Sequence, residues 1–228
     1  MRARIAVTAA ILLAGWTGAA WAYPTALNLI PTADVADRGT CNLQVEFDGS
    51  HTPFTGEGAV QLYSEFGLGR RFEAGVDLVD LNRCAEWHAD AKWQFLPESR
   101  GWPAMAVGAV GVARNGPDVR CSLDADWYVV LSRDVGRARL HGGYLNEDSG
   151  RALFGAEYQL AEPTSLLADW TTGPEAYHTL GLAQDVGGDC TVLLYWARNN
   201  TRHAGNFVGL NLSWTGRFCR HESREKAP

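Results

Sequence analysis

The chain has 228 residues, with 26 acidic and 20 basic side chains and a formal net charge of −6 at neutral pH. This acidic balance argues against nucleic-acid binding, which requires a basic face. Beyond the first residues no stretch approaches the ~18 consecutive apolar residues of a membrane-spanning helix, so a membrane protein with this sequence must be built from strands.

The first residues have the pattern of a secretory signal peptide. Arg2 and Arg4 precede an apolar run at 5–14, and the small-residue motif Ala20-Trp21-Ala22 follows it. A short apolar core with such a closing motif is typical of a cleaved signal, with an uncleaved anchor as the alternative. We therefore expect 1–22 to be a signal peptide and the mature, exported bacterial protein to begin at Tyr23.

Residues 23–39 lie between the signal peptide and the first predicted strand. They contain the sequence Leu29-Ile30-Pro31-Thr32-Ala33-Asp34-Val35. This segment could enter the periplasmic mouth of a barrel as a partial plug, or it could be a mobile leader.

From Thr40 onward the sequence alternates between apolar and polar residues in segments that end at Gly, Pro, Asn or Asp, which indicates strands and turns. After the first strand, at about 41–48, we predict eleven more near 59–66, 71–81, 87–96, 104–114, 122–132, 137–146, 151–160, 165–172, 176–185, 190–199 and 205–218. The links at 67–70, 133–136, 161–164 and 186–189 are short enough for hairpins, so neighbouring strands should be antiparallel. The parity of 104–114, with Met105, Val107 and Ala109 inside, is unusual, and 176–185 fits either parity.

The placement of aromatic residues distinguishes a membrane barrel from a soluble one. With a periplasmic N-terminus, the apolar face carries aromatic residues at two heights, and aliphatic residues such as Val45, Ala106, Val129 and Leu194 lie between them. The predicted girdles contain Trp87, Trp127, Trp170 and Trp196 on the outer side and Trp93 and Trp214 on the periplasmic side. Large rings that pack at the ends of a soluble barrel are the alternative.

These patterns predict an all-β fold: a single up-and-down antiparallel transmembrane β-barrel of about 12 strands at 40–218, followed by a polar tail at 219–228. An open sheet edge in lipid would leave backbone groups without partners, so the last strand should pair with the first. The aromatic end of the last strand resembles the closing strand of outer-membrane proteins. We therefore expect outer-membrane lipid and the barrel-assembly machinery as partners and the bacterial outer membrane as the location.

All five cysteines lie in the exported part, where disulfides persist. The threading suggests a pair between Cys84 and Cys121 in neighbouring outer loops, and a pair between Cys41 and Cys219 across the barrel seam, with Cys190 as the rival partner. The spacing contains no CxxC motif, so we predict no metal site.

The predicted lumen face is acidic. Its polar residues are Glu46, Glu73, Asp77, Asp90, Asp124, Asp126, Glu157 and Asp169, with Lys92 and Arg139 as the cations. This row is compatible with a cation-preferring pore or a surface for sugar hydroxyls, and also with paired charges that only fill a narrow barrel. The histidines lie in no recognisable catalytic motif, so we predict no enzyme, no catalytic residue and no cofactor; a membrane-embedded lipid hydrolase is the minor alternative.

Several motifs resemble those of the YjbH-like family of outer-membrane β-barrel proteins over about 23–218. They are Ile30-Pro31-Thr32-Ala33-Asp34-Val35, Ala91-Lys92-Trp93-Gln94-Phe95-Leu96-Pro97-Glu98, Leu153-Phe154-Gly155-Ala156-Glu157-Tyr158-Gln159-Leu160 and Leu166-Leu167-Ala168-Asp169-Trp170. Some members of that family are associated with exopolysaccharide production and export. The resemblance implies an outer-membrane barrel without established catalytic residues. Our first hypothesis is therefore a porin-like, non-enzymatic barrel that assists passage or surface attachment of an anionic or neutral polysaccharide. The second is a structural or adhesion barrel without transport.

Overall fold

The structure, a computed structural model, describes residues 26–50, 58–83, 85–115, 125–147, 150–201 and 205–218. The predicted signal peptide at 1–22 and the polar tail at 219–228 lie outside these residues. Among the described residues there is no helix long and apolar enough to cross a membrane.

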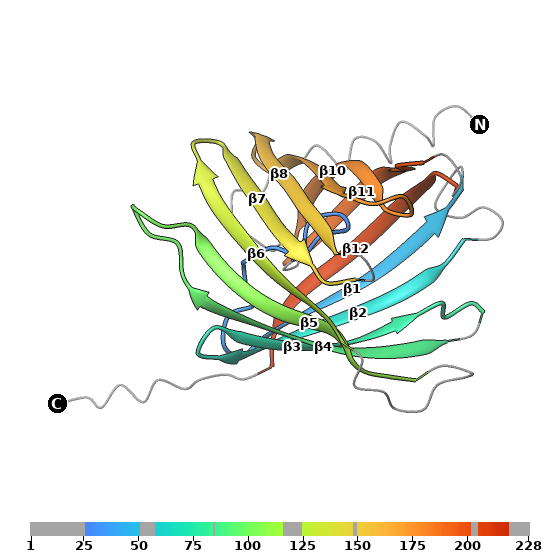
Figure 1. Ribbon diagram of the computed structural model, residues 1–228, viewed down its shortest axis with the longest axis horizontal. Helices are drawn as coiled ribbons and strands as arrows, with labels where there is room; N and C mark the ends of the chain where they lie inside the picture. The colour runs from blue at the N-terminus through green and yellow to red at the C-terminus, as the bar shows by residue number, and fades with distance from the viewer. Residues whose placement is uncertain are drawn as a thin grey trace.

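Twelve antiparallel strands form a closed barrel in which each strand pairs with its neighbours in sequence (Figure 1). The strands are β1 Thr40–Gly49, β2 Val60–Gly69, β3 Phe72–Val79, β4 Glu86–Leu96, β5 Ala104–Asn115, β6 Asp126–Val135, β7 Ala138–Leu145, β8 Arg151–Ala161, β9 Thr164–Thr171, β10 Tyr177–Gly187, β11 Cys190–Asn199 and β12 Phe207–Arg217. The barrel closes where β1 pairs with β12, from Thr40 opposite Arg217 to Gly49 opposite Val208. The predicted all-β, up-and-down antiparallel barrel of twelve strands is confirmed.

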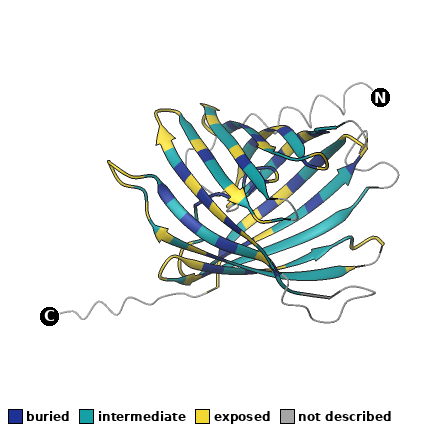
Figure 2. Cartoon of the chain, in the orientation of Figure 1, coloured by how far each residue is buried: buried dark blue, intermediate teal, exposed yellow. Residues whose placement is uncertain are grey.

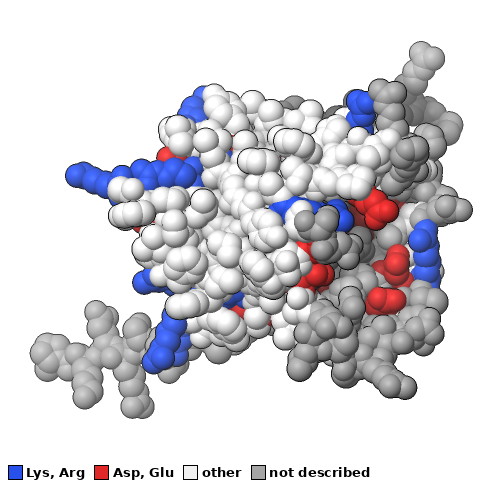
Figure 3. Space-filling model, viewed as in Figure 1, with Lys and Arg blue, Asp and Glu red and all other residues white. Residues whose placement is uncertain are grey.

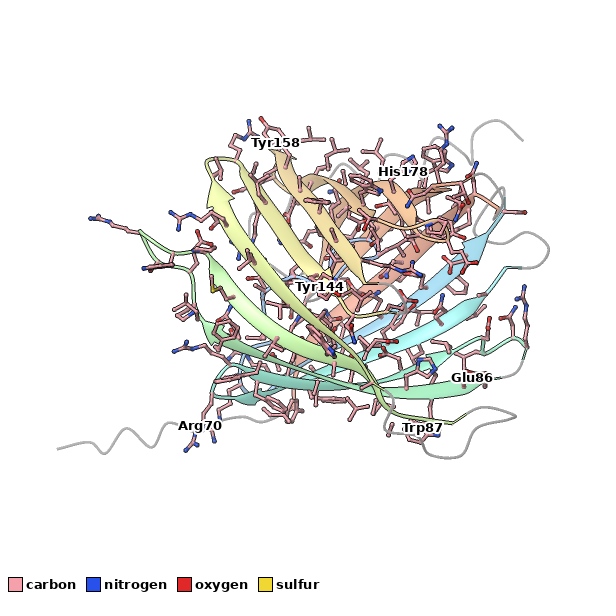
Figure 4. All side chains as sticks on the ribbon, viewed as in Figure 1. Arg70, Glu86, Trp87, Tyr144, Tyr158 and His178 are labelled. Atoms are coloured by element: carbon pink, nitrogen blue, oxygen red, sulfur yellow. The ribbon has the colours of Figure 1, made fainter. Side chains whose placement is uncertain are left out.

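The two ends of the barrel differ in the length of their connections. At one end, which we call the turn rim, β2–β3, β6–β7, β8–β9 and β10–β11 are joined by two residues each, and β4–β5 by 97–103. Arg70 and Arg71 both have positive φ (54° and 61°). Positive φ at both central residues is typical of the type I′ turn, whose twist matches that of the paired strands in a β-hairpin. The opposite end, the loop rim, carries the longer connections. Figure 4 labels Arg70 at the turn rim and Glu86 and Trp87 at the loop rim.

Alternate residues of each strand point into the lumen, as the register shows. Cross-strand partners share a face, so Glu46 opposite Asn211 and Asp77 opposite His88 lie inside, whereas Val45 opposite Leu212 lies outside. Buried and exposed residues accordingly alternate along strands such as β6 (Figure 2). In β10, Leu180 and Leu182 point outward and Thr179 and Gly181 inward, which settles the parity that the sequence left open.

Strand β5 corrects one prediction. Ala106 is fully buried and faces the lumen, and it is Met105, Val107 and Ala109 that face outward, opposite Leu131, Val129 and Trp127. The prediction placed Ala106 in the outer aliphatic band and the other three inside. The physical reason is that Ala104 and Ala106 belong to the buried apolar cluster that includes Ala33 of a segment within the lumen. Both faces of β5 are therefore apolar, and the alternation of apolar and polar residues does not show which face points inward.

The outer wall is apolar and rich in aromatic rings. The predicted girdle residues Trp93, Trp127, Trp170, Trp196 and Trp214 are exposed large side chains, and Trp87 lies on the same face, opposite Leu78. Trp170 stacks on Phe154 with ring centroids 5.6 Å apart. Uncharged side chains cover most of the wall seen in Figure 3. Such a surface is suited to lipid rather than to water.

Candidate functional site

Residues 26–37, which we call the inner segment, lie inside the barrel (Figure 1). The segment joins β1 at the turn rim through a turn in which the Thr40 amide donates to the Asp37 carbonyl at 3.0 Å. Deeper in the lumen it folds back on itself, because the Leu27 amide donates to the Ile30 carbonyl at 2.9 Å. The segment that the sequence left open as leader or partial plug thus occupies the lumen.

One half of the lumen is an apolar seat for the inner segment. Leu27, Ile30 and Ala33 are buried and belong to one cluster with lumen-facing residues of β6, β8, β9 and β11, namely Val130, Leu153, Leu167 and Leu193. Burial of a Leu or Ile side chain is worth about 1.5–3 kcal/mol. Gly155 of β8 makes room for the segment, because a Cβ there would lie 2.4 Å from Leu27 Cδ1.

A buried carboxylate holds the tip of the inner segment. Asp169 of β9 accepts the Leu29 amide at 2.8 Å through Oδ2 and the Thr179 hydroxyl at 2.6 Å through Oδ1. The same hydroxyl accepts a hydrogen bond from Asn28 Nδ2 at 2.8 Å. Asp169, predicted as a lumen-facing polar residue, therefore satisfies backbone and side-chain donors that would otherwise be buried without partners.

A serine and a histidine support the middle of the segment. Ser132 Oγ accepts the Ala33 amide at 2.9 Å and lies 2.8 Å from His141 Nδ1, while Gln94 Nε2 donates to the Ala33 carbonyl at 2.8 Å. Ser132 Oγ therefore has two hydrogen-bond partners, the Ala33 amide and His141 Nδ1. Ser132 is completely buried and its hydroxyl is occupied. This pair positions the inner segment and lacks the outward-facing geometry of a lipid hydrolase.

Two ionic clusters fix the part of the segment near the turn rim. Arg139 of β7 makes a two-pronged contact with Asp34, at 2.7 and 3.0 Å, and also binds Glu98 at 2.8 Å. On the other side of the lumen, Glu73 of β3 pairs with Lys92 of β4 at 2.8 Å, and its second oxygen accepts the Ala36 amide at 2.7 Å. Glu73 and Lys92 are only 4% and 3% exposed, so each neutralises the other in a nearly dry environment.

The inner segment does not fill the whole lumen. A first cavity of about 300 Å³ lies between residues 26–31 and the lumen face of β1–β4. We call the carboxylates on that face the acidic wall, and they are Glu46, Glu65, Glu73, Asp77 and Asp90. A second cavity of about 850 Å³ lies towards the turn rim, where Asp34, Asp37, Glu98, Asp134 and Glu157 outnumber Arg137 and Arg139. Ala26, Leu27 and Asn42 line both cavities, so the two adjoin.

The remaining predicted residues occupy separate places in this lumen. Glu46 accepts hydrogen bonds from the Tyr195 hydroxyl at 3.0 Å and from Asn211 Nδ2 at 3.1 Å. Asp126 begins β6 near the loop rim, on the lumen side by register, and Asp124 lies outside the described residues. Apart from Asp124 and Asp126, the predicted lumen set thus divides between the acidic wall, the second cavity and the contacts of the inner segment.

The sequence did not single out Ser132, Gln94 or Thr179 as supports of the segment, although their inward parity was a usable signal. Cys41 and Cys190 carry free thiols in the structure. The proposed partners Cys84, Cys121 and Cys219 lie outside the described residues, so the predicted disulfides stay predictions.

Comparison with solved structures finds porins. The KdgM porin matches with a TM-score of 0.56 at 7% identity, over 77% of this chain and 98% of that chain. The KdgM porin in complex with disordered oligogalacturonate matches with a TM-score of 0.55, at the same identity and coverage. The NanC porin matches with a TM-score of 0.54 at 10% identity, over 78% of this chain and 98% of that chain. No family model and no curated protein sequence matches the chain. The similarity is therefore one of fold.

Proposed function

We propose that this protein is a non-enzymatic, porin-like barrel of the bacterial outer membrane that passes small hydrophilic solutes beside its inner segment. One observation carries the proposal: two cavities with several carboxylates in their lining remain in the lumen beside the inner segment, and they adjoin at Ala26, Leu27 and Asn42. The porin fold and the aromatic, uncharged outer wall support the location. Outer-membrane lipid and the barrel-assembly machinery are the partners that this proposal requires.

The charge of the lumen narrows the kind of saccharide that we propose. A carboxylate-rich passage repels anions and favours neutral or cationic solutes. One similar porin was solved with oligogalacturonate, a carboxylate-bearing sugar, and the acidic wall makes such a cargo unfavourable here. If the protein assists exopolysaccharide export or surface attachment, as the resemblance to YjbH-like barrels implies, we propose neutral over anionic chains.

Conductance of the purified protein in planar bilayers tests this function. We expect small, steady current steps from the wild type, because the inner segment occupies part of the lumen. A variant that lacks residues 26–36 should give steps several-fold larger, since the segment is the main obstruction. The matched control is Glu175→Gln on an exposed loop, which should leave the step size unchanged.

A structural or adhesion barrel without transport is the second candidate. The observation that favours it is the number of specific contacts that hold the inner segment, from Asp169 at the tip to Arg139 and Glu73 near the turn rim. This candidate predicts no current steps from the wild type and steps only from the deletion variant. That outcome would replace the proposed transport function.

A further inference from the structure

The first cavity is lined by two chemically different groups of side chains. The first group is the acidic wall, and Lys92, the single basic residue among the described lining residues, already pairs with Glu73. The second group is apolar and includes Leu29 of the inner segment and Val110 of β5. A cavity that combines several carboxylates with apolar groups is suited to a solute that carries both a positive charge and an apolar face.

Three buried side-chain oxygens of residues that line this cavity have no hydrogen-bond partner among the described residues, and one of them is Asn28 Oδ1 of the inner segment. Asn42 Oδ1 belongs to a side chain that is only 6% exposed and that lines both cavities, and Asp90 Oδ1 lies on the acidic wall. A buried acceptor without a donor is unfavourable, so each is a place where a ligand N–H or O–H would be stabilised.

The arrangement of the acids favours an organic cation over a metal ion. Within the described part of the chain, no three His, Cys, Asp or Glu side chains converge closely enough to hold a metal. Asp77 and Asp90 instead lie on neighbouring strands, two residues apart in register, because Asp77 pairs with His88 and Asp90 pairs with Gly75. Separated carboxylates of this kind bind an ammonium group together with other donors on the same molecule.

We propose that the first cavity binds an amine-bearing sugar, with its ammonium group at Asp77 and Asp90, a donor to Asn42 Oδ1, and the apolar face of its ring against Leu29 and Val110. The cavity, at about 300 Å³, is at the small end of ligand-sized pockets, which limits the solute to one or two sugar units. This inference deepens the proposed function, on which it rests for the route by which the solute reaches the lumen.

Saturation-transfer NMR on the mature, full-length protein in detergent micelles tests the site directly, with glucosamine, glucose and galacturonate as probes. We expect saturable binding of glucosamine, weaker binding of glucose and none of galacturonate. The isosteric double variant Asp77→Asn/Asp90→Asn should weaken glucosamine binding by about tenfold, because two charge-assisted contacts are lost. The matched control is Glu162→Gln/Glu175→Gln, which removes two exposed carboxylates that line neither cavity.

Folding of each variant is checked by the mobility shift that boiling produces on electrophoresis, and Asp90→Asn alone replaces the double variant if that one does not fold. Equal binding of glucosamine and glucose, or undiminished binding in the folded variant, overturns the proposal. A protein that binds glucosamine but gives no current supports the site and contradicts transport. A protein that conducts but does not bind glucosamine contradicts the site alone.

Discussion

Small residues on the lumen face determine where the inner segment lies. Gly155 leaves space that Leu27 and Ile30 occupy, and Ala104 and Ala106 are small members of the buried cluster that includes Ala33. A larger side chain at any of these positions would compete with the segment for volume. The apolar seat of the inner segment therefore depends on these small residues as much as on the leucines around it.

We predict that Gly155→Ala destabilises the barrel by about 1–3 kcal/mol, because the new methyl group would overlap Leu27 Cδ1. Urea unfolding in micelles, followed by tryptophan fluorescence, measures the free energy of unfolding. Gly142→Ala on the outer face of β7 is the control, since the nearest atom to its Cβ is 3.9 Å away. Equal losses of unfolding free energy from the two substitutions would show that the lumen has room for a methyl group at Gly155.

The buried pair Glu73–Lys92 is suited to a double-mutant cycle. Lys92→Met should reduce the free energy of unfolding by about 3–5 kcal/mol, because it leaves the Glu73 carboxylate buried and unpaired. The double variant Glu73→Gln/Lys92→Met should lose less than Lys92→Met alone, since no uncompensated charge remains. Additive losses in the same urea experiment would mean that the two groups do not interact in solution.

The inward carboxylates could be predicted from single residues because a polar side chain in an alternating strand has only one favourable face. The supports of the inner segment could not be predicted in this way. From the sequence alone Asp169 is one polar residue among many. Its hydrogen bond with the Leu29 amide joins residues 140 positions apart in the chain. Such pairings depend on the closed barrel, which local patterns do not encode.

At the level of elements, the strands differ in how clearly their sequence defines their faces. Strands β1 and β4 alternate sharply, because one face meets the polar cavity and the other the outer wall. Strand β5 is apolar on both faces, since its inner face packs on the inner segment. The sequence therefore predicted the strands themselves well and the orientation of β5 incorrectly.

A charge on the outer wall tests whether lipid surrounds it. Leu194 points outward near the middle of β11 and is 50% exposed in the isolated chain. We expect Leu194→Arg to destabilise the barrel by ~2–4 kcal/mol in lipid vesicles, and Val186→Arg, at the turn rim, by only ~0–1 kcal/mol. Urea unfolding from vesicles measures both. If both substitutions were tolerated equally, that result would indicate that water, and not lipid, surrounds the outer wall.

For the whole molecule, closure between the first and last strands is the decisive feature. The seam register pairs Gln44 with Ser213, both on the lumen side, whereas Leu212 points to the opposite face. In a background with all native cysteines replaced by serine, Gln44→Cys/Ser213→Cys should form a disulfide readily, because paired strand residues lie within bonding range. Gln44→Cys/Leu212→Cys is the control and should remain reduced. Similar yields from both would contradict the register of the closed barrel.

The position of the inner segment also constrains the order of biogenesis. Residues 26–37 emerge from the ribosome before any strand, yet their contacts reach β3, β4, β6, β7, β9 and β10. The segment is attached directly to β1, and β1 pairs with β12, the last strand of the chain, to close the ring. The contacts of the segment with β9 and β10 can therefore form only after most of the barrel has been synthesised.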